Sequence, residues 1–445
     1  MKSFGLWLAF AAGCATLPPH QAALRDDAKG LDDLSSDKPC EALSEFHDAL
    51  AVEPGAWAPL GHEVLATRRC GGLDRLLESA RSRVAHRPEE PLGHYLLGLC
   101  LLAGPGGERE GLAELQKARA LAPNDPELAL RLGIALLESE KWSEAVEPLE
   151  RAVALAPADP HPRFPLSLAL HRTGHDHEAL ASLAAAVPLL PTDKDLEAGR
   201  KLVRLLHDPE RGIPLPARPR FEEGMSWLDR HEAGKRAVEV FEALQSDYPQ
   251  LAPLQAALGL AYQQLGDAAQ AVAHFERAAE LDPSLPEPHL YLGELYLGLR
   301  RHREAAQELR AAIAGDPFLE EARAKLEELA VDAGDVQTAI AQSQALVGLL
   351  GGKPMARLLL TRALALAGDL EGAEAQLHAI LESDPKNLQA KIDLAAIDVK
   401  RSMNAASPED RHRLTDRARK LLGEVLADQP ENAAANQLLA TLAKK

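Results

Sequence analysis

The chain has 445 residues and a formal net charge of −18, and hydrophobic residues make up 46% of it while aromatic residues make up only 4%. A core with so few aromatic residues has to be built from Ala and Leu, which favours closely packed helices over a large β domain. The acidic charge argues against a nucleic-acid binder, because counterion release from phosphates requires a basic surface.

The first residues differ in character from the rest of the chain. Lys2 precedes an apolar stretch from Phe4 to Ala12, and small residues lead up to Cys14. This pattern predicts a signal peptide over residues 1–13, because the apolar stretch is too short to cross a bilayer as a helix.

The ending Ala11-Ala12-Gly13-Cys14 resembles the bacterial lipobox, although Ala11 stands where that family usually has Leu. The resemblance implies cleavage before Cys14, lipidation of Cys14 and a short tether, so that residues 14–22 form the anchor segment. Several acyl chains would hold the protein firmly, since each buried methylene contributes about 0.8 kcal/mol. Ala15 resembles the residue that directs such lipoproteins to the outer membrane. An ordinary cleaved signal peptide is the alternative.

Prolines then recur at a nearly constant spacing, with successive steps of 34, 35, 34 and 34 residues. A fixed period in this range predicts a solenoid of repeated helix pairs. Residues 23–208 are therefore expected to form a first block of about five repeats followed by an extra helix that begins near Lys194. The prolines of this series are Pro54, Pro88, Pro123, Pro157 and Pro191.

Residues 209–219 contain four prolines and are expected to form a non-helical joint, because proline fixes φ and disfavours helix in the residue before it. Residues 220–432 are expected to form a second block of about six repeats. The last of these is 11 residues longer than the others, and the excess is expected in a loop near 402–411. Residues 433–445 are predicted to be a capping helix that covers the final apolar face.

The repeat is clearest over residues 254–283, where two short amphipathic helices are joined at Gly266. Small residues, among them Gly259, Ala271 and Ala278, stand where two helix backbones must approach closely. With these residues at these offsets, and a proline after the second helix, the unit resembles the tetratricopeptide repeat (TPR). The resemblance implies an all-α, right-handed superhelical solenoid of about ten helix-turn-helix units in two blocks, with its concave side lined by the first helix of each unit.

On this resemblance, positions 2, 5, 9 and 12 of each unit are expected to face the concave groove. In the third to fifth units these positions are largely apolar, which predicts that the groove receives a partner helix or an extended peptide. The alternative is that this face packs on neighbouring helices in a tight coil. The predicted groove residues are Tyr95, Leu99, Leu102, Leu130, Ile134, Leu137, Phe164 and Leu168.

Two cysteines are predicted to pair. Cys40 is expected to begin the second helix of the first unit, and Cys70 to end the first helix of the second unit. Antiparallel packing would bring both to one edge, which predicts a disulfide in an oxidising compartment. Cys100 is expected to be a buried apolar residue. The alternative is that all three cysteines serve only in packing.

The chain offers little for chemistry. Gly352-Lys353 is followed by Pro354 and lacks the glycine five residues upstream that the motif requires, so it is not a phosphate-binding loop. His175-Asp176-His177 falls in a predicted turn between helices, where polar residues are expected in any case. Sixteen histidines show no grouping of nucleophile, base and orienting residue. The prediction is therefore a protein without enzymatic activity, metal site, cofactor or small-molecule substrate.

The predicted function is a non-enzymatic scaffold for protein–protein interaction. By analogy with lipoproteins of this repeat class, it is expected to face the periplasm from the outer membrane and to assemble a secretion, pilus or motility complex. Other proteins are the expected partners, the membrane is contacted only through the lipid, and nucleic acid is not a partner. Two alternatives are an adaptor for cell-wall (peptidoglycan) enzymes and a cytoplasmic TPR regulator that is not exported.

Overall fold

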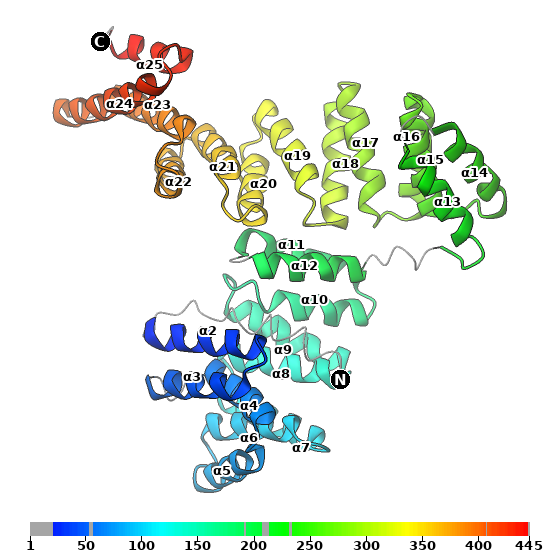
Figure 1. The fold of residues 1–445 in the computed structure, drawn as a ribbon, viewed down its shortest axis with the longest axis vertical. Coiled ribbons are helices and arrows are strands. Elements are labelled where there is room, and N and C mark those ends of the chain that lie inside the picture. The colour runs from blue at the N-terminus through cyan, green and yellow to red at the C-terminus, as the bar shows by residue number, and fades with distance from the viewer. Residues whose placement is uncertain are drawn as a thin grey trace. The chain divides into compact units, whose positions relative to one another are not determined.

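The computed structural model describes residues 21–52, 57–190, 193–206, 213–230, 234–405 and 407–443 (Figure 1). Helices joined by short turns account for nearly all of these residues, and no strand occurs among them. The fold class is therefore all-α, as the Ala- and Leu-rich composition predicts. Within the same ranges, no helix combines the length and the apolar character that spanning a membrane requires.

The chain divides into two compact units, which are Met1–Arg218 with Ala314–Phe318, and Pro219–Ile313 with Leu319–Lys445. The predicted joint at 209–219 lies at the end of the first long segment. Its residues 209–212 fall outside the described ranges, and residues 213–217 are not helical. Two prolines within 213–217 explain this, because a proline cannot donate a helical hydrogen bond.

The first unit is a series of antiparallel helix pairs followed by a single helix, α12 (Asp193–Leu206). A short 3-10 helix (Val187–Leu189) follows the last pair. The pairs are α2 (Gln21–Ser35) with α3 (Pro39–Val52), α4 (Trp57–Cys70) with α5 (Leu73–His86), α6 (Pro91–Ala103) with α7 (Glu108–Leu121), α8 (Pro126–Glu138) with α9 (Trp142–Leu155), and α10 (Arg163–Arg172) with α11 (Asp176–Ala186).

The second unit repeats the same arrangement and ends in a single helix, α25 (Ala433–Ala443). In α25, Ala435 and Leu442 are buried against the preceding pair. The pairs are α13 (Arg218–Leu228) with α14 (Gly234–Asp247), α15 (Ala252–Gln264) with α16 (Ala268–Leu281), α17 (Pro286–Gly298) with α18 (His302–Gly315), α19 (Glu320–Ala333) with α20 (Val336–Leu349), α21 (Pro354–Ala367) with α22 (Leu370–Ser383), and α23 (Leu388–Met403) with α24 (Pro408–Asp428).

Proline and aspartate mark where many helices begin. Pro286 lies in the first turn of α17, where the missing N–H has no helical partner to lose. Asp267 and Asp369 cap α16 and α22 by accepting hydrogen bonds from the backbone N–H groups of Gln270 (3.1 Å) and Gly372 (2.8 Å). The periodic sequence thereby becomes a periodic set of helix boundaries.

Close approach of the two helices in a pair depends on a small residue in the first helix. A Cβ atom on Gly259 would lie 2.6 Å from the ring of Phe275 on the second helix. In the fifth repeat Ser167 stands at this position, and its buried hydroxyl donates a hydrogen bond to the carbonyl oxygen of Ala179 at 2.9 Å. The serine therefore keeps the close approach and satisfies its own polar group.

The longer last repeat differs from the sequence prediction. The extra residues were expected in a loop near 402–411, but α23 and α24 absorb them as additional helical turns and have 16 and 21 residues, respectively. Only a short connection remains between Met403 and Pro408. Pro408 lies in the first turn of α24, and Ser407 caps that helix by accepting a hydrogen bond from the backbone N–H of Asp410 at 3.0 Å. A proline at this position begins a helix instead of interrupting one.

Candidate functional site

The groove predicted in the first unit is largely closed by its own side chains. Tyr95 is fully buried, and its hydroxyl donates a hydrogen bond to the carbonyl oxygen of Trp57 at 3.0 Å. Its ring meets the Trp57 ring edge-on at 5.1 Å between centroids. Leu130, Leu137 and Phe164 are also buried. These four residues belong to the core and are not available to a partner, which corrects their assignment to an open groove.

The other four predicted groove residues, Leu99, Leu102, Ile134 and Leu168, are half-buried. All but Leu168 pack against the core of the first unit. The cause lies in α4, which contacts both α6 and α8. A Cβ atom on Gly61 of α4 would lie 3.0 Å from the Tyr95 hydroxyl, so the absent side chain lets α4 lie directly on this face. Most of this face therefore packs on neighbouring helices, which is the alternative to an open groove.

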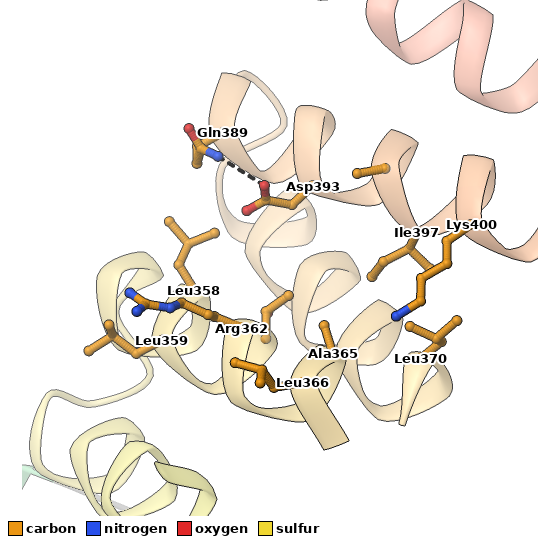
Figure 2. Close-up of a pocket in the computed structure, with 12 residues that line it drawn as sticks. Leu358, Leu359, Arg362, Ala365, Leu366, Leu370, Gln389, Asp393, Ile397 and Lys400 are labelled. Atoms are coloured by element: carbon orange, nitrogen blue, oxygen red, sulfur yellow. Dashed lines mark hydrogen bonds between the residues drawn. The ribbon is translucent and has the colours of Figure 1, made fainter. Parts of the chain in front are cut away.

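An open pocket of about 780 Å³ lies instead in the second unit, between the first helices of two successive repeats (Figure 2). This volume falls within the range of about 300–1,000 Å³ typical of ligand sites. Helix α21 contributes Leu358, Leu359, Thr361, Arg362, Ala365 and Leu366. Helix α23 contributes Gln389, Asp393, Ala396, Ile397 and Lys400, and Leu370 comes from the start of α22.

The wall from α21 is mainly aliphatic. Leu358 and Leu359 are half-buried, while Leu366 keeps 47% of its surface exposed. On the opposite wall Ile397 is buried beneath the pocket. Exposed leucine at the mouth of an apolar pocket is typical of a surface that binds another molecule. Figure 2 shows the side chains of Leu358 and Ile397 directed into the space between the two helices.

The charged groups of the α23 wall lie at the two ends of the pocket, and Arg362 lies on the α21 wall. Asp393 accepts a hydrogen bond from Nε2 of Gln389 at 2.9 Å (Figure 2). Burial raises the pKa of the Asp393 carboxyl, and the hydrogen bond from Gln389 offsets only part of that rise. Lys400 is exposed at the other end, beside Leu370. Nη2 of Arg362 lies 4.0 Å from Oδ1 of Asp332.

The sequence carried a signal for this pocket. The rule that assigns positions 2, 5, 9 and 12 to the groove, applied to the repeat that begins at residue 354, selects Met355, Leu358, Arg362 and Ala365. Three of these four line the pocket. The rule identifies the face correctly, but whether that face is open depends on how tightly successive repeats wind.

The cysteines lie where the helix register predicts. Cys40 is in the first turn of α3 and Cys70 ends α4. In the structure the two are joined as a disulfide with a Cα–Cα distance of 5.2 Å. Cys100 is a buried free thiol, and burial raises its pKa to about 12. Cys14 and the predicted signal peptide lie outside the described residues.

The histidine cluster of the fifth repeat makes local hydrogen bonds. Nδ1 of His171 lies 2.6 Å from Oδ1 of Asp176, and the Thr173 hydroxyl lies 3.0 Å from Nδ1 of His175. These contacts join the two ends of the turn between α10 and α11. Across the ranges that the structure describes, no group of three His, Cys, Asp or Glu side chains is arranged to hold a metal ion.

Comparison with known proteins agrees with the repeat pattern. Residues 249–299 match a family model described as TPR repeat, and residues 106–160, 130–194 and 328–387 match one described as tetratricopeptide repeat. The matched segments therefore carry tetratricopeptide repeats, the repeat that the sequence pattern resembles. No curated protein sequence matches it.

Several solved structures resemble parts of the chain. YrrB, a TPR protein with an unusual peptide-binding site, is 20% identical over 45% of this chain and 97% of its own, with a TM-score of 0.38. TTC0263 of Thermus thermophilus, a thermophilic TPR protein, is 24% identical over 41% of this chain and 99% of its own, with a TM-score of 0.32. PilW, a type IV pilus biogenesis factor, is 17% identical over 51% of this chain and 100% of its own, with a TM-score of 0.34.

Proposed function

We propose that the chain is a non-enzymatic scaffold that binds a segment of a partner protein in the pocket between α21 and α23. The observation that carries this proposal is the open, leucine-lined space of about 780 Å³ in the second unit. The corresponding face of the first unit is filled by Tyr95 and its neighbours, so the second unit is the better candidate for a binding surface.

The pocket is large enough to supply useful affinity. Each Leu or Phe side chain that a partner buries contributes about 1.5–3 kcal/mol. Two or three such anchors would offset a large part of the rotational and translational freedom lost on association, which costs roughly 4–15 kcal/mol. The anchors alone therefore give at most about −5 kcal/mol, a dissociation constant of roughly 0.2 mM.

Peptide selection against the purified full-length protein tests this proposal. Peptides selected by the wild type are expected to lose at least tenfold in affinity for Leu366→Asp, which places a charge in the mouth of the pocket. Leu299→Asp is the matched control, because Leu299 is an equally exposed leucine at the end of the first helix of another repeat, with 54% of its surface exposed against 47% for Leu366. Equal loss in both variants, or loss in neither, would overturn the proposal.

We also propose that the protein is lipidated at Cys14 and faces the periplasm, where it assembles a secretion, pilus or motility complex. The support is the lipobox-like ending Ala11-Ala12-Gly13-Cys14 after an apolar stretch. Metabolic labelling with a fatty acid is expected to mark wild-type protein in the membrane fraction and to leave Cys14→Ala unlabelled. Recovery of full-length unlabelled wild type from the cytosol would overturn this part and favour the cytoplasmic regulator.

A further inference from the structure

The pocket of Figure 2 holds two opposite charges that have no ion-pair partner in the part of the chain that the structure describes. Asp393 receives one hydrogen bond, from the neutral amide of Gln389. Lys400 makes no ion pair there and is exposed at the other end of the pocket. Both side chains belong to α23.

The other charged side chains of α23 are paired with neighbouring helices. Lys391 lies 2.7 Å from Glu424 of α24. Asp398 is bound by Arg417, also of α24, with Nε to Oδ2 at 2.6 Å. Arg401 forms an ion pair with Glu374 of α22. Of the five charged residues on this helix, the two that line the pocket are therefore the two left without an opposite charge.

The spacing of the two charges sets a length scale. Asp393 and Lys400 are seven residues apart, which on a helix is close to two turns and about 10.5 Å along the axis. Residues seven apart lie on the same face, so both side chains border the same groove. Ile397 lies between them, and Leu358 and Leu366 face them from α21. Along α23 the order is acid, apolar centre and base, and the facing wall of α21 adds Arg362, whose guanidinium is paired with Asp332.

We propose, building on the pocket function above, that the occupant is an amphipathic helix of a partner protein that carries a Lys or Arg and an Asp or Glu seven positions apart, with an aliphatic residue between them. Its cation lies at Asp393, its aliphatic side chain enters the leucine-lined centre, and its anion lies at Lys400. The two ion pairs fix the direction in which a given partner helix lies in the groove.

A helix fits these positions better than an extended segment does. In an extended chain about 10 Å corresponds to three residues, and an odd separation directs the two side chains to opposite faces. In a helix the same distance corresponds to seven residues on one face. A partner helix running along α23 therefore meets both charges and the apolar centre with a single stripe of side chains.

Burial also favours a cation at Asp393. The half-buried carboxyl has a raised pKa because it is partly removed from water, and an adjacent positive charge lowers the free energy of the ionised form. A partner helix with an acid beside Asp393 or a base beside Lys400 would instead bring two like charges together. Their repulsion discriminates against such a partner.

Four synthetic helical peptides with the same leucine core test the inference on the full-length protein. They carry at their two outer positions Lys and Glu, Lys and Lys, Glu and Glu, or Gln and Gln, and their affinities are measured by fluorescence anisotropy. The wild type is expected to bind the Lys/Glu peptide about tenfold more tightly than the Gln/Gln peptide at low salt. This advantage is expected to shrink in high salt, because exposed charges are screened.

Charge reversal at the exposed end provides the decisive comparison. Lys400→Glu, a surface change that leaves the core intact, is expected to make the Lys/Lys peptide the tightest of the four. Asp393→Asn is expected to remove the preference for a peptide cation. If all four peptides bind equally to wild type but lose affinity for Leu366→Asp, the pocket function stands and the charge inference is overturned. If none binds, both are overturned.

Discussion

A Cβ atom on Gly133 of α8 would lie 2.4 Å from Cγ of Leu149 on α9. Leu149 is fully buried, so its side chain cannot turn out into solvent to make room. The second helix of this repeat can approach the first only because the first carries no side chain at this point. Close packing of the two helices thus requires a small residue at 133 opposite the large side chain of Leu149.

Gly133→Ala is therefore expected to destabilise the repeat, even though alanine is the better helix former. Overpacking of a core costs about 1–3 kcal/mol, which exceeds the roughly 1 kcal/mol that alanine gains over glycine in helix propensity. The urea midpoint is expected to fall, and hydrogen exchange is expected to quicken first in α8 and α9.

Gly423→Ala is the control for that experiment. Gly423 lies inside α24, and a Cβ atom there would meet nothing within 4 Å. The substitution is expected to leave the urea midpoint unchanged or to raise it, with a gain of about 0.5–1 kcal/mol. If both alanine variants behaved alike, close packing at Gly133 would not be the reason for the glycine.

The disulfide predicts a specific count of thiols. In a Cys14→Ala protein, denatured without reductant, one reactive thiol is expected, which is Cys100, and three are expected after reduction. In the folded protein Cys100 is expected to react very slowly, because it is buried and its pKa is raised to about 12. Three reactive thiols before reduction would exclude the Cys40–Cys70 bond.

His161 gives the first unit a dependence on pH. Its Nδ1 lies 2.5 Å from Asp159, and its Nε2 lies 3.4 Å from Asp195. Burial alone would lower the pKa of this imidazole, but the hydrogen bonds and charges of the two carboxylates outweigh it and raise the pKa to about 9. Since the folded pKa exceeds the unfolded value of about 6.5, the protonated form stabilises the fold.

This contribution is fully present below about pH 6.5 and is lost as the pH rises through about 9, and it amounts to roughly 3 kcal/mol. Urea midpoints measured from pH 6 to pH 10 are expected to decline across this window for wild type. In His161→Gln the same decline is expected to be absent. An equal decline in the variant would assign the pH dependence to another group.

The sequence alone predicts the repeat, but it does not predict which groove is open to a partner. Prolines, glycines and capping aspartates act locally, so they predict where helices begin, end and approach, and they place Cys40 and Cys70 at adjoining helix ends. Whether a groove stays open is decided by contacts between repeats. Because Gly61 of α4 has no side chain, Tyr95 can pack in the core of the first unit. The two residues are 34 positions apart and belong to different repeats, so the sequence of one repeat does not predict this contact.

The buried carboxylate of Asp398 was also invisible in the sequence pattern. It lies on α23 with none of its surface exposed, and Arg417 of α24 donates to it from Nε at 2.6 Å. The same guanidinium donates to Glu374 of α22 at 2.7 Å. The two residues are 19 positions apart, as are Arg323 and Gln342 in an ordinary repeat. The lengthened last repeat moves the pair to another point along the two helices, so the regular repeat does not indicate where it lies.

Arg417→Met is therefore expected to be strongly destabilising, because it leaves the Asp398 carboxylate buried without its cation. Breaking a fully buried pair from one side costs about 3–5 kcal/mol, and the loss here is expected near or below the lower end because the Arg417 side chain keeps 39% of its surface exposed. Replacing both partners with apolar residues is often close to neutral. The double variant Asp398→Leu with Arg417→Met is thus expected to recover most of the loss in urea midpoint. Arg413→Met on the same helix is the matched control, since its pair with Asp410 is exposed and contributes at most about 1 kcal/mol. A double variant less stable than Arg417→Met alone would show that the ion pair itself, and not the relief of an unpaired charge, stabilises the last repeat.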